Sequence, residues 1–139
     1  DKENVVSHNK NTIESKAVTS AKEILPLAHD CDVVGVDEAQ FFDLNLTDVC
    51  TELANNGIRV IVAGLDMDFM GKPFGPIPNL MAIAEFVSKV HAICLSCGDL
   101  AQFSHRKSKD DHLVLLGETQ EYEPLCRKCF QQALKDDAQ

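Results

Sequence analysis

Residues 32–40 read Asp-Val-Val-Gly-Val-Asp-Glu-Ala-Gln, a short apolar run that ends in two acidic residues. A run of this length without polar alternation is typical of a strand buried in a parallel sheet. In open α/β sheets, ligands bind outside the carboxyl ends of the strands, where Asp37 and Glu38 would stand. The stretch therefore predicts a strand with two carboxylates at a ligand-binding edge, although the start of a solvated loop fits the same two acids equally well.

A helix and a second strand are expected directly downstream. Apolar residues recur there at helical spacing: Leu46, Val49, Cys50 and Leu53. Gly57 stands where such a helix would stop, and Arg59–Leu65 is again a continuous apolar run after its first residue. Strand, helix and strand in this order predict a parallel pair with a right-handed crossover in an α/β domain.

The remaining segments give weaker signals. Residues 1–20 are polar and predict a loop, and Ala21–Leu27 predicts a short helix interrupted near Pro26. A proline- and glycine-rich loop near residues 73–78 precedes a pattern that predicts an amphipathic helix through Leu80, Ile83, Ala84, Val87 and Val90. After residue 92 the sequence changes to cysteines, short strand-like runs and charged turns. We therefore expect a core at 1–92 and a small metal-bound lobe at 93–139.

Composition limits the classes of function. The 139 residues are 45% hydrophobic, which suits one packed domain with a small appendage. No apolar run approaches the roughly 18 residues of a membrane span, and the polar start has no signal-peptide core. The net charge of −9 would repel a polyanion, so nucleic acid is not an expected partner, whereas a small phosphorylated ligand remains possible. We expect a cytoplasmic protein that does not bind membranes.

Four of the six cysteines form two C-x-x-C pairs, Cys94 with Cys97 and Cys126 with Cys129. Two such pairs can place four thiolates on one Zn²⁺ ion. A four-thiolate site leaves no open coordination position, so the expected zinc is structural rather than catalytic. Two disulfides or four unrelated thiols are the alternative, which a reducing compartment disfavours.

The acidic pair allows two enzyme hypotheses. Asp37 after a buried strand is similar to a Walker B acid, which helps to hold Mg²⁺ on nucleotide phosphates and leaves Glu38 available for proton transfer. Taken alone, Asp37-Glu38-Ala39-Gln40 is also similar to an ATPase motif of the helicase kind. The short chain, its negative charge and the metal lobe without a basic stripe weaken that second hypothesis.

Further segments carry a specific resemblance. The series begins with Asp37-Glu38-Ala39-Gln40-Phe41-Phe42. It continues with Val60-Ile61-Val62-Ala63-Gly64-Leu65-Asp66, then with Phe69 and Lys72-Pro73-Phe74-Gly75, and ends with Tyr122-Glu123-Pro124-Leu125-Cys126. In this order and at these separations, from about Val6 to Phe130, they resemble the zinc-containing thymidine kinases. The resemblance implies a P-loop-NTPase-like parallel sheet with a small C-terminal zinc-ribbon-like lobe.

The resemblance also implies roles for individual residues. Glu38 would be the general base for the 5′-hydroxyl of thymidine, and Asp37, Glu38, Ala39 and Gln40 would lie at the nucleotide with its Mg²⁺. Leu65 and Phe69 would line the base pocket, and Tyr122 would close over it. Residues Leu113, Val114, Leu115, Leu116 and Gly117 would form a loop whose backbone holds thymine. Cys94, Cys97, Cys126 and Cys129 would bind zinc.

The chain departs from the family pattern at its beginning. No Gly-rich loop ending in Gly-Lys-Ser or Gly-Lys-Thr occurs in the 139 residues, so this chain lacks the P-loop that cradles ATP phosphates. We expect the chain to be incomplete for activity unless the full-length protein supplies that loop. The resemblance further implies thymidine and ATP as substrates, feedback inhibition by thymidine triphosphate and a homotetramer. A zinc-ribbon interaction module without catalysis remains the non-enzyme alternative.

Overall fold

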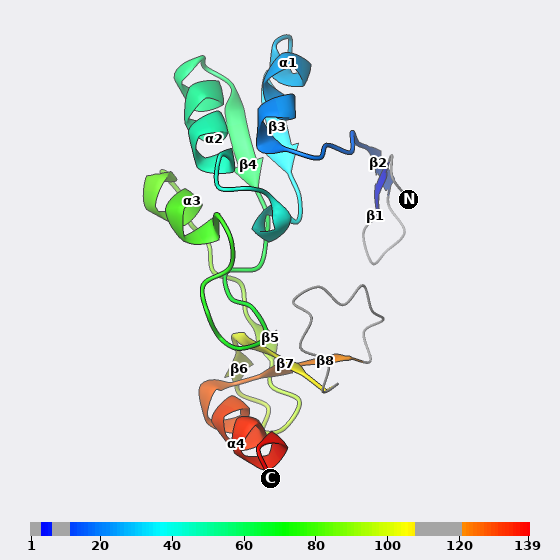
Figure 1. Ribbon diagram of the computed structural model, residues 1–139, viewed down its shortest axis with the longest axis vertical. Helices are drawn as coiled ribbons and strands as arrows, with labels where there is room; N and C mark the ends of the chain where they lie inside the picture. Colours follow the sequence, from blue (N-terminus) through cyan, green and yellow to red (C-terminus); the bar gives the residue numbers. More distant parts are fainter. Residues whose placement is uncertain (1–3, 7–11, 108–120) are drawn as a thin grey trace. The chain divides into compact units, whose positions relative to one another are not determined.

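The computed structural model describes residues 4–6, 12–107 and 121–139 (Figure 1). The chain divides into two compact units, each formed by two stretches of sequence. The first unit comprises Asp1–Leu65 and Gly75–Ala84, and the second comprises Asp66–Phe74 and Glu85–Gln139. Each unit has a buried cluster of its own, so each is described separately. The functional division at residue 92 stays a prediction.

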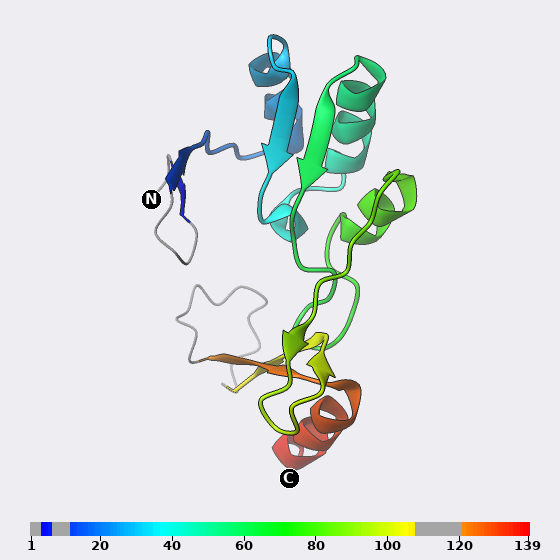
Figure 2. The same cartoon turned by 180° about the vertical axis from the view of Figure 1, so that it is seen from behind.

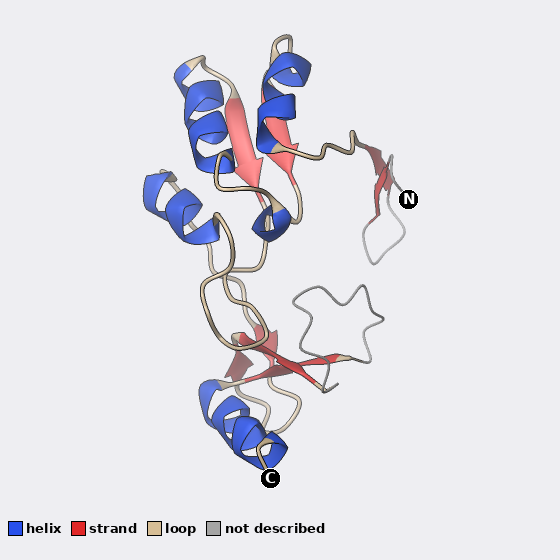
Figure 3. Cartoon of the chain, viewed as in Figure 1, coloured by secondary structure: helices blue, strands red, loops and turns tan. Residues whose placement is uncertain are grey.

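The first unit is built on two parallel strands, β3 (Val33–Val36) and β4 (Arg59–Val62). Helix α2 (Leu46–Asn55) connects them (Figure 3). Gly57 after the helix takes the left-handed conformation at a φ of 81°. The register pairs Val36 with Val62, so both strands end at the same edge. The predicted strand, helix and parallel strand are confirmed, although β4 ends at Val62 rather than at Leu65.

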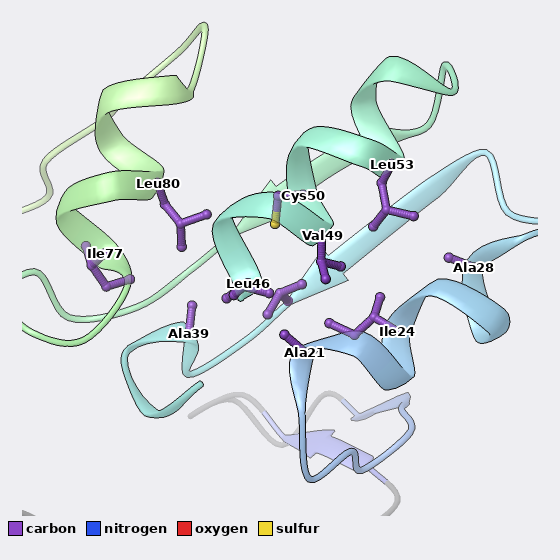
Figure 4. Close-up of a cluster of buried hydrophobic side chains, with 11 residues drawn as sticks. Ala21, Ile24, Ala28, Ala39, Leu46, Val49, Cys50, Leu53, Ile77 and Leu80 are labelled. Atoms are coloured by element: carbon purple, nitrogen blue, oxygen red, sulfur yellow. The ribbon is translucent and has the colours of Figure 1, made fainter. Parts of the chain in front are cut away.

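Helices cover one face of this strand pair, which Figure 2 shows from the uncovered side. The core between helices and strands is apolar (Figure 4), and it includes Ala21, Ile24, Ala28, Leu46, Val49, Cys50, Leu53, Ile77 and Leu80. Leu46 has no exposed surface. Burying a side chain of that size contributes about 1.5–3 kcal/mol relative to leaving it in water. Side chains alternate between the two faces along β3 and β4, so Val33 and Ile61 point to the other face and are about half exposed.

Two sequence predictions for this region are wrong. Residues 1–20 are not only loop, because β1 (Asn4–Val6) pairs antiparallel with β2 (Thr12–Glu14). Strands of three residues are too short for a period to be read from the sequence. Helix α3 (Ile77–Ile83) ends before the predicted Val87 and Val90 because Ala84 is extended at a ψ of 138°. Val90, in the extended segment after the helix, is 92% exposed.

Near Pro26 the predicted interruption is a change of helix type. The 3-10 helix η1 (Ala21–Glu23) runs into helix α1 (Ile24–Ala28), which contains Pro26 in its first turn. A proline is tolerated at that place because the first N–H groups of a helix have no partner within the helix. The short helix still buries Ile24 and Ala28.

The second unit contains two small antiparallel pairs and a final helix. Strand β5 (Ala92–Ile93) pairs with β6 (Leu100–Ala101), and β7 (Phe103–Arg106) pairs with β8 (Tyr122–Leu125). Helix α4 (Arg127–Asp137) buries Phe130, whose ring stacks on Phe103 at 4.5 Å between centroids. The short strands were expected from the sequence, whereas α4 was not.

Together the units make a small mixed helix and strand protein with a cysteine cluster in its second unit. Within the part of the chain that the structure describes, no helix is long and apolar enough to cross a membrane.

Candidate functional site

The carboxyl end of β3 carries an exposed acidic pair. Asp37 and Glu38 follow Val36 directly, and the Glu38 N–H donates to Asp37 Oδ1 at 2.9 Å. Glu38 has a φ of 51°, a value uncommon for a residue with a side chain. Such conformations persist only where the surroundings impose them, and they concentrate at functional sites. The chain therefore turns sharply at Glu38 and presents its carboxylate at the sheet edge.

Gln40 ties this carboxylate to the neighbouring strand. It lies in the 3-10 helix η2 (Ala39–Phe41) and is only 3% exposed. Its Nε2 donates to Glu38 Oε2 at 2.5 Å, and its Oε1 accepts the Leu65 N–H at 3.0 Å. One buried amide thus joins the residues that follow β3 to those that follow β4. Ala39 is fully buried, so its side chain serves packing.

Two glycines make room for Gln40. A Cβ at Gly64 would lie 2.8 Å from Gln40 Oε1. A Cβ at Gly75 would lie 2.3 Å from the Gln40 backbone oxygen, and Gly75 itself has a φ of 50°. Both glycines belong to the motifs quoted above, but their spatial relation to Gln40 could not be read from the sequence. Because these two glycines have no side chain, the loops that contain them can pack against Gln40.

Leu65 follows β4 in the same unit and is 50% exposed, so its side chain is available for contact. The backbone around it is fixed, because the Ala63 N–H donates to Val36 O at 2.9 Å and the Ala39 N–H donates to Ala63 O at 3.0 Å. These bonds extend the β3–β4 pairing beyond the strands. The first unit therefore contains Asp37, Glu38, Gln40 and Leu65 at one edge of its sheet.

Phe69 belongs to the second unit, in a tight turn. The Asp68 carboxylate oxygen Oδ1 accepts the Met70 N–H at 2.9 Å and the Lys72 N–H at 3.0 Å, and the Asp68 N–H donates to Lys72 O at 2.8 Å. An aspartate that bonds its own following backbone fixes a turn locally. The turn is closed further by a bridge between Met67 and Pro73. Phe69 is thereby held in a defined place and is partly buried.

Arg106 contacts both aromatic residues predicted for the base pocket. Its guanidinium carbon lies 3.7 Å from the Phe69 ring centroid, and its Nη2 donates to Tyr122 Oη at 3.2 Å. Arg106 is 5% exposed and is paired directly with Tyr122 across β7 and β8. Sequence reasoning missed this residue, because nothing in the short run Phe103–Arg106 distinguishes it from a solvated arginine.

The four cysteines of the C-x-x-C pairs come together in the second unit. Their sulfur atoms all lie within 4.8 Å of one another, and Cys97 Sγ is 3.6 Å from Cys126 Sγ. Sulfurs bound to one tetrahedral zinc at ~2.3 Å would be about 3.8 Å apart. All six cysteines of the chain are free of disulfides. The cluster therefore has the donor atoms and spacing that a structural zinc requires, and it could bind a metal ion.

The surroundings favour the thiolate at Cys94 but not at Cys97. Burial raises the pKa of the Cys94 thiol, but N–H groups of Cys126, Cys97 and Ser96 offset this and lower the pKa to about 6. At Cys97 the Asp99 N–H lowers the pKa, but the Cys126 sulfur and burial outweigh it and raise the pKa to about 12. With four sulfurs so close together, one thiolate disfavours the next unless a cation is shared.

His105 joins the β7–β8 hairpin to helix α4. Its Nδ1 lies 2.9 Å from Glu123 Oε1, and its Nε2 lies 2.8 Å from Asp137 Oδ2. Burial lowers the pKa of His105, but the carboxylates of Asp137 and Glu123 together outweigh burial and raise it. A histidine with a carboxylate at each ring nitrogen donates two hydrogen bonds only when it is protonated.

A hollow of about 440 Å³ opens at the opposite end of the first unit's strands. Cys31, Asp32 and Ile58, which precede β3 and β4, are among its lining residues. The carboxyl ends of the strands, where ligands of α/β sheets bind, carry Asp37 and Glu38 instead. The predicted thymine-binding residues 113–117 lie outside the described residues.

Comparisons with known proteins identify the family of the chain. The family model described as thymidine kinase matches residues 1–130. A thymidine kinase of Bacteroides fragilis is 64% identical over 133 residues, which cover 96% of this chain and 67% of the relative. That of Bacteroides thetaiotaomicron is 64% identical over 137 residues, covering 99% and 69%. That of a Rhodothermus species is 56% identical over 127 residues, covering 91% and 60%. The chain belongs to the thymidine kinase family.

Proposed function

We propose that this chain carries the acceptor-activating and base-binding parts of a thymidine kinase, which transfers the γ-phosphoryl group of ATP to the 5′-hydroxyl of thymidine. Thymidine kinase function is supported by the family match and by relatives of 55–64% identity. The structural observation that carries the proposal is the Glu38 carboxylate, held at the end of β3 by the buried Gln40.

Glu38 acts as the general base in this proposal. The thymidine O5′ attacks the γ-phosphorus, the bond from phosphorus to the β,γ-bridging oxygen breaks, and ADP leaves. The hydroxyl proton passes to Glu38. Phosphoryl transfer depends mainly on positioning and charge neutralisation, so a carboxylate fixed in one orientation suits the task. The hydrogen bond from Gln40 holds the Glu38 carboxylate in one orientation.

Asp37 is the residue that would lie at Mg²⁺ when ATP is bound. Its carboxylate is exposed at the strand end, and only one of its oxygens accepts the Glu38 N–H. Oxygen donors of this kind suit Mg²⁺, which when bound neutralises phosphate charge. We assign the parallel strands of the first unit to a P-loop-NTPase-like core on the basis of this edge and of the family.

From the family resemblance, thymidine recognition is assigned to Leu65, Phe69, Tyr122 and the loop 113–117. Leu65 and Phe69 supply apolar surface for the base, and Tyr122 forms a lid. The loop is apolar, so its backbone is the proposed partner of the base N–H and carbonyl groups. Leaving those groups unpaired in a closed site would cost about 1–3 kcal/mol each.

The cysteine cluster is proposed as a structural zinc site. Four sulfur donors complete a tetrahedral shell, and so the ion would fold the second unit rather than touch substrate. The cluster lies in the same unit as Phe69 and Tyr122, and in the sequence its two C-x-x-C pairs flank the segment containing residues 113–117. A homotetramer, inhibition by thymidine triphosphate and a cytoplasmic location are proposed from the family resemblance alone.

Phosphoryl transfer from γ-labelled ATP tests this function in the full-length protein. We expect label to move to thymidine and not to 5′-deoxythymidine, which lacks the accepting hydroxyl. The helicase-like ATPase hypothesis predicts instead ATP hydrolysis that nucleic acid stimulates and thymidine does not affect. The interaction-module hypothesis predicts no transfer to either nucleoside.

A further inference from the structure

Arg106 stands out among the residues without a role in the proposed function, because it is a buried cation between two aromatic residues. Its guanidinium lies over the Phe69 ring at 3.7 Å from Cζ to the centroid, and it lies 5.6 Å from the Tyr122 ring centroid. With 5% exposure, it has little water around it. A cation over an aromatic face attracts the ring more strongly when water is excluded.

The two rings come from segments far apart in the sequence. Phe69 is held in the turn closed by Asp68, whereas Tyr122 is the first residue of β8. Arg106 reaches Tyr122 as its cross-strand neighbour and reaches Phe69 through the face of the guanidinium. Both rings therefore contact one planar group, the guanidinium of Arg106, whose backbone is fixed in β7.

Resting on the proposed function, we propose that Arg106 is a positioning residue for nucleoside recognition: it fixes Phe69 and Tyr122 as the two aromatic contacts of the pyrimidine base. Arg106 itself is not a catalytic residue, because it acts through the two rings. Its planar fork allows stacking and hydrogen bonding at once, which a lysine ammonium cannot reproduce.

The hydrogen bond also sets the direction of the Tyr122 hydroxyl. Nη2 of Arg106 donates to Tyr122 Oη, so one oxygen lone pair is occupied. The hydroxyl hydrogen then remains available to an acceptor on the nucleoside. In this arrangement Tyr122 is both a lid and an oriented donor, and its orientation depends on Arg106.

The test measures the steady-state constants of the full-length enzyme for both substrates. Arg106→Met should raise the KM for thymidine about tenfold to hundredfold, the range expected when a desolvated cation–π contact and a hydrogen bond are lost. The KM for ATP and the kcat should stay within about twofold, because the chemistry of Glu38 is untouched. Lys107→Met is the matched control, since it removes a charge from the next residue, which is exposed. It should leave all three constants unchanged.

A double-mutant cycle separates positioning from a general loss of stability. Phe69→Leu should itself raise the KM for thymidine, and adding Arg106→Met to it should have little further effect, because the two residues act as a unit. Additive effects would overturn the proposal. A loss of bound zinc or a fall in kcat with Arg106→Met would also overturn it, since these indicate a structural role in the whole unit.

Arg106→Lys serves if the methionine variant does not fold. It keeps the charge but loses the fork, so we expect a smaller rise in the KM for thymidine than methionine would cause, at unchanged zinc content. An unchanged KM would overturn the proposal. If the wild-type enzyme phosphorylates thymidine and the Arg106 variants have a normal KM for it, only this inference is rejected. If the wild type does not phosphorylate thymidine, the proposed function is rejected as well.

Discussion

Glu38 and Gln40 form a hydrogen-bonded pair in which the buried amide Nε2 donates to the exposed carboxylate Oε2 at 2.5 Å. The same amide accepts the Leu65 N–H at 3.0 Å through its Oε1. The proposed base is therefore oriented by a residue that also connects the ends of β3 and β4. Glu38 can be displaced without being mutated, if Gln40 is changed.

Gln40→Leu should lower kcat and stability together. The substitution leaves the Leu65 N–H without its acceptor, which costs about 1–3 kcal/mol where the group is buried. It also frees the Glu38 carboxylate to rotate away from the reacting hydroxyl. Denaturant unfolding and kcat measure the two effects. Gln131→Leu, at an exposed position of α4, is the control and should change neither. A Gln40→Leu enzyme with full kcat would show that Gln40 does not orient the base.

Gly75→Ala should destabilise the first unit more than Gly57→Ala. Both glycines have positive φ, of 50° and 81°, so alanine strains the backbone at each by roughly 1 kcal/mol. Only at Gly75 would the new Cβ collide, at 2.3 Å from the Gln40 backbone oxygen, whereas nothing lies within 4 Å at Gly57. Overpacking adds about 1–3 kcal/mol. Equal free energies of unfolding for the two variants would contradict the close packing of Gly75 against Gln40.

The parts of the fold that the sequence predicted are those with a long or repeated local signal. The apolar run before Asp37, the helical spacing from Leu46 to Leu53 and the two C-x-x-C pairs each correspond to an element or cluster in the structure. The predicted helix was too long because the apolar period continues to Val90, whereas helix α3 ends at Ile83 and Val90 is exposed.

What the sequence could not predict depends on contacts between distant segments. The place of Gln40 between Glu38 and Leu65 follows from the parallel register of β3 and β4. Likewise, the contact of Arg106 with Phe69 joins a hairpin to a remote turn. Such residues carry no local pattern, because their partners are chosen by the fold. The roles of residues 113–117 stay predictions.

Zinc removal should unfold the second unit. We expect one zinc per chain, bound by four sulfurs at ~2.3 Å, and Cys126→Ser should reduce both metal content and the thermal stability of this unit. X-ray absorption gives the ligand type, and metal analysis gives the stoichiometry. Cys31→Ser is the control, because Cys31 lies outside the cluster. A purified protein that holds no metal, with the cysteines of its C-x-x-C pairs joined by disulfides, would refute the zinc site.

The His105 network should make the second unit more stable in mild acid than in alkali. The folded pKa of His105 is raised above 6.5, its ordinary value, since Asp137 and Glu123 outweigh the effect of burial. Its contribution is therefore fully present below that ordinary value and is lost as the pH rises through the folded pKa. Lys107, 3.8 Å from Glu123, is the other charge beside this network.

The measurement is the difference in melting temperature between wild type and His105→Gln from pH 5.5 to pH 9. The melting temperature of the wild type should exceed that of His105→Gln by most at pH 5.5, and the difference should shrink towards pH 9. A difference in melting temperature that is constant or grows with pH would show that His105 is held as the neutral imidazole.

Glu38→Gln in the full-length protein tests most directly whether Glu38 is the base of a thymidine kinase. A positioned general base contributes about 10²–10⁴-fold, so kcat should fall by that factor. Thymidine binding, measured by calorimetry, should stay within about threefold, because the base pocket is assigned to other residues. Glu52→Gln, an exposed glutamate of α2 in the same unit, should keep full kcat. A Glu38→Gln enzyme with near-normal kcat would contradict the assignment, whereas loss of kcat with thymidine binding retained is the result we predict.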